Sequence, residues 1–177
     1  MSTVPTSQAQ ARVHIRWMIR RDMPEVLAIE HGSFEYPWCE EEFLRVLRQR
    51  NCIGMVAELE ERIVGYMIYE LHRNKITVLD FATHPEFRRL GIGRQMVTKL
   101  VDKLSSQRRN RIALCVRETN LSAQLFFRQQ EFKAVKVLKN FYEDSGEDAF
   151  LMEFRVGSED DDDLDRVVNR IARYEQN

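Results

Sequence analysis

The sequence has few cysteines, few glycines and no long apolar run. Its three cysteines are odd in number and far apart, with neither a C-x-x-C pair nor the histidine spacing of a zinc site. No segment approaches the roughly 20 apolar residues of a membrane-spanning helix. The opening residues also lack the apolar block of a secretory signal. We therefore expect a cytoplasmic protein with reduced thiols, no metal site and no membrane partner.

A large net charge is missing as well, because 27 lysines and arginines face 28 acidic residues. A nucleic-acid-binding domain usually carries a basic excess on one face. Arg108, Arg109 and Arg111 form a basic cluster, but no stacking aromatic residues interleave with it. We expect no nucleic-acid partner, and we interpret the cluster as either a solvated face or a site for a cofactor phosphate.

The hydrophobic pattern predicts one central domain, residues 12–156, between two tails. Residues 1–11 are polar and aperiodic, and we expect them to be disordered. Apolar residues recur at strand spacing in segments 13–19, 53–83, 111–116, 133–140 and 147–156. They recur at helical spacing in segments 23–34, 40–50, 91–107 and 120–130. Asp22 and Asn120 are the expected N-caps, and the alternation of strands and helices predicts a mixed α/β fold.

Residues 157–177 differ in composition from the central domain. Five consecutive acidic residues, 159–163, repel one another and predict a solvated linker. A short apolar stripe flanked by arginines follows and predicts an amphipathic helix. This helix is interpreted as lying on its own domain, as docking a partner, or as carrying the acidic segment to the cofactor site.

The stretch RRLGIG places two of only seven glycines directly before a predicted helix. A helix N-terminus has unpaired N–H groups and a partial positive charge, so it attracts phosphate. Gly91 and Gly93 let the backbone approach an anion closely, and Arg88, Arg89 and Arg94 add positive charge. The stretch lacks the third glycine of a dinucleotide fingerprint and the lysine of a P-loop. It predicts either a pyrophosphate site or a glycine turn with solvated arginines.

These residues resemble the acetyl-CoA signature of the GNAT acetyltransferases, R/Q-x-x-G-x-G/A, with Arg88, Gly91 and Gly93 at the motif positions. VRETNLSAQLFFRQQEF resembles the segment with that family's cofactor-binding asparagine, and the likeness spans residues 12–156. The resemblance implies a mixed, mostly antiparallel central sheet with flanking helices, and acetyl-CoA as the cofactor. The cofactor contacts that it implies are Phe81, Ala82, Thr83, Arg88, Arg89, Leu90, Gly91, Ile92, Gly93, Arg94, Asn120 and Phe127.

Within that family the chain is most similar to enzymes that acetylate protein N-termini, especially the bacterial one that modifies the N-terminal alanine of a ribosomal protein. FEYPW and KNFYEDSGEDAFLM resemble their two substrate loops, so the implied acceptor contacts are Phe34, Tyr36, Trp38, Phe141 and Tyr142. The implied reaction is acetyl transfer to the α-amine of a protein, by a monomer or dimer. Two alternatives stay open: a small-molecule amine as acceptor, and a protein that binds acetyl-CoA without catalysis.

The resemblance fails at the two assigned catalytic positions. Cys115 stands where the ribosomal-protein enzyme has a glutamate general base, and Phe127 stands where it has a tyrosine general acid. Tyr142 is a candidate replacement, because its hydroxyl can bind the peptide or relay a proton. Glu35 is either a second catalytic candidate or an exposed loop acid.

Three other positions carry weaker interpretations. Cys115 either forms a covalent acyl intermediate or packs as an inert strand thiol. Asp80 either holds a water molecule or caps a bulge. Thr77 stands where histone-modifying relatives have a glutamate, so that position supplies no base either.

The missing base favours an α-amine over a lysine as the acceptor. An α-amine with a pKa of about 7.7 to 8.0 is roughly one fifth neutral near pH 7.4, whereas lysine with a pKa of about 10.4 is neutral in about one molecule per thousand. An alkyl thiol with a pKa of about 8.5 is also a tolerable leaving group. We therefore expect slow but measurable transfer to N-terminal amines.

Overall fold

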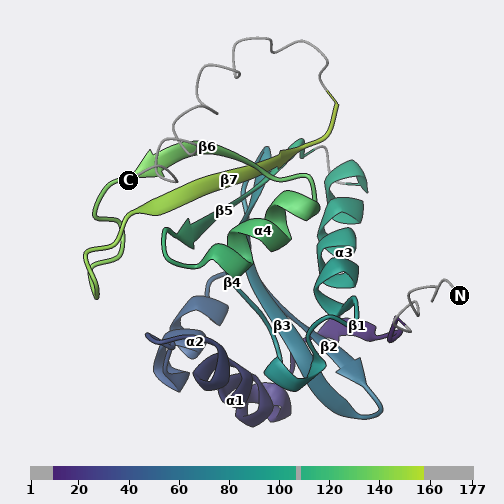
Figure 1. The fold of residues 1–177 in the computed structure, drawn as a ribbon. Helices are drawn as coiled ribbons and strands as arrows, with labels where there is room; N and C mark the ends of the chain where they lie inside the picture. The colour runs from purple at the N-terminus through teal and green to yellow at the C-terminus, as the bar shows by residue number, and fades with distance from the viewer. Residues whose placement is uncertain (1–9, 107–108, 158–177) are drawn as a thin grey trace, which may run out of the picture. The chain divides into compact units, whose positions relative to one another are not determined.

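The computed structural model describes residues 10–106 and 109–157 (Figure 1). The strands are β1 (His14–Trp17), β2 (Cys52–Leu59), β3 (Arg62–Leu71), β4 (Lys75–Thr83), β5 (Arg111–Arg117), β6 (Lys133–Leu138) and β7 (Ala149–Arg155). The α-helices are α1 (Met23–Ser33), α2 (Glu40–Leu47), α3 (Ile92–Ser106) and α4 (Leu121–Gln129). Short 3-10 turns, η1 (Arg20–Asp22) and η2 (Pro85–Phe87), precede α1 and α3.

The strands follow the order β1-β2-β3-β4-β5-β7-β6 in a mostly antiparallel sheet. β1 pairs antiparallel with β2, and β7 pairs antiparallel with both β5 and β6. β4 and β5 run parallel, with Ile76 opposite Ile112. A parallel pair needs a crossover connection, and this connection contains α3. The mixed, mostly antiparallel α/β class predicted from the sequence is confirmed.

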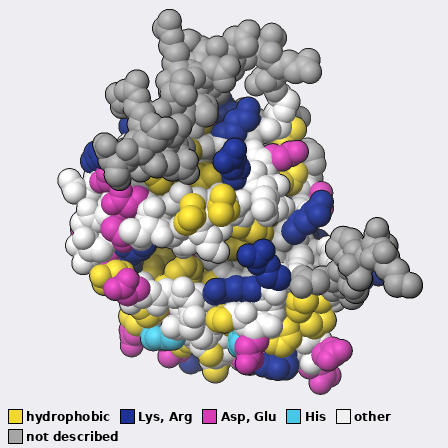
Figure 2. Space-filling view, viewed as in Figure 1, with side chains coloured by type: hydrophobic (Ala, Val, Ile, Leu, Met, Phe, Trp, Pro, Cys, Tyr) yellow, Lys and Arg dark blue, Asp and Glu magenta, His cyan; other side chains and the backbone are white. Residues whose placement is uncertain are grey.

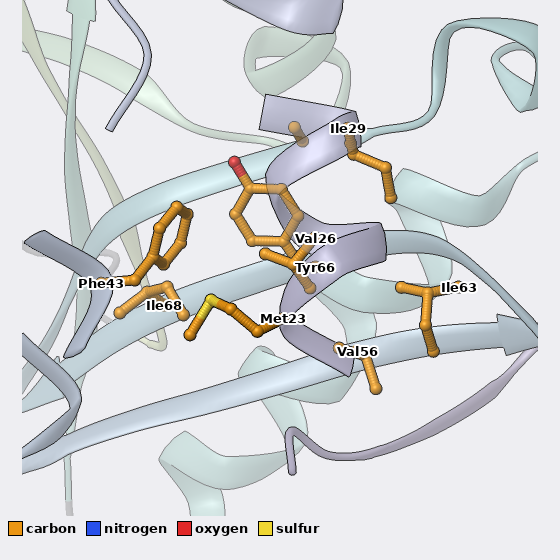
Figure 3. Close-up of a cluster of buried hydrophobic side chains, with 9 residues drawn as sticks. Met23, Val26, Ile29, Phe43, Val56, Ile63, Tyr66 and Ile68 are labelled. Carbon is orange, nitrogen blue, oxygen red and sulfur yellow. The ribbon is translucent and has the colours of Figure 1, made fainter. Parts of the chain in front are cut away.

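The described part of the chain divides into two compact units, one of residues 10–68 with 80–99 and one of residues 69–79 with 100–106 and 109–157. In the first unit, α1 and α2 pack on β2 and β3 around one hydrophobic core (Figure 3). The core side chains are Met23, Val26, Ile29, Phe43, Val56, Ile63, Tyr66, Ile68 and Ala82. The buried residues of α1 recur every three or four positions, because one face of the helix meets the sheet.

In the second unit, β5 pairs with β7 along its whole length, from Arg111 to Arg117. The Phe127 ring of α4 packs edge-on against Phe132, with ring centroids 5.3 Å apart. Asn120 caps α4 as predicted, because its Oδ1 accepts a hydrogen bond from the Ala123 N–H at 3.1 Å. The cap places α4 directly after β5, at the end of the strand.

Asp22 does not cap α1 through its side chain, so this prediction was wrong. The carboxylate instead accepts hydrogen bonds from the Arg16 guanidinium at 2.8 and 2.9 Å and from the Ile19 N–H at 2.8 Å. The bidentate pair with Arg16 engages both carboxylate oxygens and turns them away from the first turn of α1. Pro24 in the first turn also has no N–H to be capped.

Gln10 and Ala11 lie against the start of α3, where the Ala11 N–H donates to the Leu90 carbonyl at 3.1 Å. Residues 1–9 and the predicted acidic linker and helix beyond residue 157 lie outside the described residues. Of the helices in the described ranges, none is long and apolar enough to cross a membrane. Residues 10–106 and 109–157 bring no three His, Cys, Asp or Glu side chains together as a metal site. Figure 2 shows basic and acidic side chains interspersed on the viewed face.

Candidate active site

The predicted phosphate-binding turn connects η2 to the start of α3. Gly91 has a φ of +77° and Arg89 a φ of +66°, so two left-handed residues turn the chain into the helix. Arg88 anchors the turn, because its Nε donates to the Thr83 carbonyl and its Nη2 donates to Ser33 Oγ, both at 3.1 Å. The turn is therefore attached to the end of β4 and to α1.

The geometry of this turn fits a pyrophosphate. The first N–H groups of α3 have no acceptor within the helix and carry the positive end of its dipole. A Cβ atom at Gly91 would lie 2.9 Å from Gln10 Cγ, so both the packing and the positive φ select glycine there. Arg89 and Arg94 are exposed and can pair with phosphate oxygens. The residues from Arg88 to Arg94 remain the predicted site for this part of acetyl-CoA.

A buried polar cluster lies in the same unit. The Tyr66 hydroxyl contacts Glu30 Oε2 and lies 3.1 Å from Asp80 Oδ2. Tyr66 is fully buried, while Glu30 is 2% and Asp80 is 9% exposed. Figure 3 shows the Tyr66 ring among core side chains, with its hydroxyl pointing away from Met23. Burial raises the pKa of both carboxyl groups, and the charge of Glu30 raises the pKa of Asp80 further.

This cluster is connected to the predicted acceptor loop, residues 34–38. Glu30 Oε1 accepts a hydrogen bond from the Trp38 backbone N–H at 2.7 Å. Phe34 and Trp38 pack on the core of the unit, whereas Tyr36 is 41% exposed. Glu35 is exposed, and its proposed catalytic role stays a prediction. The buried Glu30 carboxyl group therefore fixes the backbone of the 34–38 loop at Trp38.

In the second unit, Asn120 and Phe127 lie at the start and on the buried side of α4. Phe127 is 7% exposed, and its ring packs against Phe126 and Phe132 with centroids 5.0 and 5.3 Å away. A buried phenyl ring has no proton to donate, so this position contributes packing in place of an acid. The contacts of Asn120 and Phe127 with acetyl-CoA stay predictions.

The predicted acceptor residues Phe141 and Tyr142 lie on the loop between β6 and β7, and Arg117 of β5 holds this loop. The guanidinium lies over the Tyr142 ring, 3.8 Å from its centroid. It also donates to Asp144 at 2.9 and 2.6 Å and to Glu147 at 2.9 Å. The pairing with Arg117 lowers the pKa of Asp144. Phe141 is 47% exposed next to this anchored tyrosine.

The two strand positions at which the family resemblance led us to expect a base, Cys115 and Thr77, hold no carboxylate. Cys115 is half-buried, and burial raises the pKa of its thiol, which makes the thiol a weak nucleophile at neutral pH. The Thr77 hydroxyl is buried and has no hydrogen-bond partner among the described residues. Burial, with a smaller contribution from Cys115, raises the pKa of Tyr142 to about 12. The Tyr142 phenol is therefore protonated at neutral pH and acts as a donor.

The sequence-based predictions missed Glu30, Tyr66 and Arg117. Glu30 follows Val26 by four residues and so falls on the apolar face of α1, where an acid is unexpected. That position was the available signal for a buried polar cluster. Arg117 had no such signal, because its partners lie 27 to 30 residues later in the chain.

Residues 23–132 match the model of the acetyltransferase (GNAT) family. The chain belongs to the GNAT acetyltransferase family. Members of this family transfer an acetyl group from acetyl-CoA, so this GNAT protein is an acetyltransferase with acetyl-CoA as its cofactor. The turn from Arg88 to Arg94 lies inside the matched region.

Among its relatives, the ribosomal protein bS18-alanine N-acetyltransferase of Salmonella typhimurium is 26% identical over 133 residues, which cover 74% of this chain and 89% of that protein. The crystal structure of Ard1 from Thermoplasma volcanium matches this GNAT protein with a TM-score of 0.75 at 25% identity, covering 82% and 99% of the two chains. Arabidopsis thaliana NAA60, solved with acetyl-CoA, shares the fold with a TM-score of 0.71 at 16% identity, covering 82% and 100%.

Proposed function

We propose that this GNAT enzyme acetylates the N-terminal α-amine of a protein, and that a ribosomal protein beginning with alanine is the first candidate. The names of its relatives support this class of acceptor, because one acts on the alanine of ribosomal protein bS18. The free cysteines support a reducing, cytoplasmic setting for the reaction.

The observation that carries the proposal is the half-buried thiol of Cys115, at the strand position where the family resemblance led us to expect a glutamate base. Without a carboxylate at this position, the acceptor has to be neutral when it binds. Near pH 7.4, the neutral fraction of an α-amine is roughly 200 times that of a lysine side chain, given their ordinary pKa values. The site is therefore suited to N-terminal amines.

Bound acetyl-CoA would supply the acetyl group as a thioester, and the residues of this chain would hold both reactants. The turn from Arg88 to Arg94, with left-handed backbone at Arg89 and Gly91, would hold the pyrophosphate with backbone N–H groups and arginines. Tyr142, whose ring is held by Arg117 and whose phenol is protonated, would bind the peptide or donate a proton to the departing thiolate. The α-amine loses its proton to solvent before attack, because its ordinary pKa lies near physiological pH.

The test is the release of free thiol from acetyl-CoA with two matched peptides. One peptide has a free N-terminal alanine and no lysine, and the other is N-terminally blocked and carries one lysine. The proposal expects release with the first peptide at a rate at least 50 times that of the second. Equal rates, or faster lysine acetylation, would contradict it. Tight acetyl-CoA binding without turnover on either peptide would support a non-catalytic binding protein.

The predicted cofactor turn is tested separately with Gly91→Ala. A left-handed φ costs alanine about 1 kcal/mol, and the new methyl group would collide with Gln10. We expect at least tenfold weaker acetyl-CoA binding by titration calorimetry. Gly146→Ala is the matched control, because Gly146 has a φ of +71° but no atom within 4 Å of its Cβ position. An equal loss of affinity in both variants would remove the turn from the cofactor site.

A further inference from the structure

Two buried carboxyl groups face a single hydroxyl in the first unit, and their hydrogen bonds require a proton. Glu30 Oε1 and Asp80 Oδ1 each accept a backbone N–H, from Trp38 at 2.7 Å and from Phe81 at 2.8 Å. The other two oxygens, Oε2 and Oδ2, both contact the Tyr66 hydroxyl. One O–H group can donate to only one of them.

The missing donor is a proton on one of the acids. The Tyr66 hydroxyl can donate to one of the two oxygens and can form a second hydrogen bond only with a protonated one, so the cluster requires a proton on Glu30 or Asp80. Burial raises the pKa of both acids, and the charge of Glu30 raises that of Asp80 further, well above its ordinary value, so we assign the proton to Asp80. Two ionised carboxylates sharing a buried site repel each other strongly.

The surroundings of the cluster contain few other charges that could replace this proton. On α1, the neighbouring His31 lowers the pKa of Glu30 through its charge. α2 presents the uncharged ring of Phe43 to Tyr66, with centroids 5.8 Å apart. On β4, the backbone of Phe81 is the group that meets Asp80. The proton count of the cluster is thus set mainly by its own three residues.

The cluster connects two segments that the proposed reaction uses. Glu30 holds the backbone of the acceptor loop at Trp38, and Asp80 holds the backbone at Phe81, the first of the predicted cofactor contacts on β4. Tyr66 bridges the two carboxyl groups from β3. Loss of the shared proton would place two charges in contact and push Glu30, with the Trp38 backbone, away from Asp80.

We propose that Asp80 and Tyr66 are positioning residues for the acceptor: they share one proton with Glu30, and this proton keeps the loop of residues 34–38 in its acceptor-binding position. The inference rests on the proposed function, because the acceptor is taken to bind at that loop. It assigns the network to acceptor binding, separate from acetyl-CoA binding and from the chemical step.

The kinetic test compares the wild type with Asp80→Asn between pH 6.5 and 9.5. Asparagine keeps a hydrogen-bond donor for the Tyr66 hydroxyl but cannot ionise. We expect the acceptor KM of the wild type to rise at least fivefold at alkaline pH relative to that of Asp80→Asn, with kcat and acetyl-CoA affinity unchanged. The titration of the acceptor amine is common to both enzymes and cancels. Tyr66→Phe should raise the acceptor KM about tenfold at every pH.

Glu153→Gln is the matched control, because Glu153 is also a 9% exposed acid but pairs with Arg111 and Arg155 in the second unit. It should keep the wild-type pH profile. The inference is overturned if Asp80→Asn retains that profile, or if Tyr66→Phe leaves the acceptor KM unchanged.

A second readout needs no acceptor and separates this inference from the proposed function. Trp17 is 68% exposed, so Trp17→Phe leaves Trp38 as the only tryptophan without disturbing the core. We expect the Trp38 emission to change with alkaline pH in this background, and Asp80→Asn to abolish that change. An emission change that Asp80→Asn abolishes supports the network even if no N-terminal peptide is acetylated. Emission that is independent of pH in the Trp17→Phe protein overturns it.

Discussion

Two polar networks hold the two predicted acceptor loops, and they differ in burial. Glu30, Tyr66 and Asp80 hold the loop before α2 from inside the core, where no side chain of the three is more than 9% exposed. Arg117 holds the loop between β6 and β7 by pairing with Asp144, whose side chain is 35% exposed. The first network contains two acids and no cation, whereas the second pairs its acids with a guanidinium.

The acid pKa values shift in opposite directions in the two networks, because burial dominates in the first and the arginine partner dominates in the second. Burial raises the pKa of Glu30 and Asp80, whereas the Arg117 hydrogen bonds lower the pKa of Asp144. A buried polar group left without its partner costs far more than an exposed ion pair contributes. The buried network should therefore govern stability, and the exposed network should mainly govern the position of its loop.

The largest expected effect is the loss of stability in Glu30→Ala. The change leaves the Trp38 N–H without its acceptor and removes one of the two carboxyl partners of the buried Tyr66 hydroxyl, at a cost of about 3 kcal/mol of unfolding free energy. Urea unfolding should show a lower midpoint with an unchanged m-value. Glu35→Ala, at an exposed position five residues later, should stay within about 0.5 kcal/mol of the wild type. Equal losses of unfolding free energy in Glu30→Ala and Glu35→Ala would show that burial of the acid does not decide its contribution to stability.

Arg117→Met should affect acceptor binding more than stability. The substitution keeps a long aliphatic side chain but removes the contacts with Tyr142, Asp144 and Glu147. We expect the acceptor KM to rise about tenfold, with a smaller decrease of the urea midpoint than in Glu30→Ala, because these ion pairs are only partly buried and Asp144 remains solvated. Arg155→Met is the control, since Arg155 pairs with Glu153 and should leave the acceptor KM unchanged. A large drop in stability without a KM change would reverse the assigned role.

The pH dependence of stability should have opposite signs in the two networks. The pKa of Asp80 is raised in the folded protein, so the folded state holds the Asp80 proton more tightly than the unfolded chain does. The free energy of unfolding of the wild type should therefore fall, relative to that of Asp80→Asn, as pH rises above about 4. The pKa of Asp144 is lowered, so its contribution is present above about pH 4 and is lost as pH falls through the folded-state pKa. Urea unfolding of Asp80→Asn, Asp144→Asn and the wild type from pH 3 to 8 measures both slopes. If the contributions of Asp80 and Asp144 to the unfolding free energy changed with pH in the same direction, the proposed difference between the two networks would be wrong.

The smallest expected effect is that of Lys139→Met at the edge of the second network. The Lys139 side chain is 62% exposed and pairs with Asp148 at 2.5 Å. Exposed pairs of this kind often contribute nothing measurable. We expect no measurable shift of the urea midpoint and no change in acceptor KM. A clear shift in either quantity would show that exposed pairs in this loop matter more than burial predicts.

The sequence by itself determined the fold class, the turn at Gly91 and the family resemblance. These features are local: strand and helix periodicity appears within a few residues, and the glycine turn precedes its helix directly. The Asn120 cap was predicted for the same reason, since its partner Ala123 is three residues away. Asp22 was mispredicted because its partner Arg16 belongs to the preceding strand.

Only the tertiary structure decided which polar groups share the two networks. Tyr66 lies 36 residues from Glu30 and 14 from Asp80, and folding alone brings the three side chains into one buried site. Arg117 and Asp144 are 27 residues apart in the chain. They meet because Arg117 of β5 pairs with Ala149, the first residue of β7, and Asp144 lies in the loop that leads into β7. Local patterns carry no information about such distant partners. The sign of each pKa shift is likewise a property of the folded chain, because burial raises the pKa of Asp80 and the distant Arg117 lowers that of Asp144.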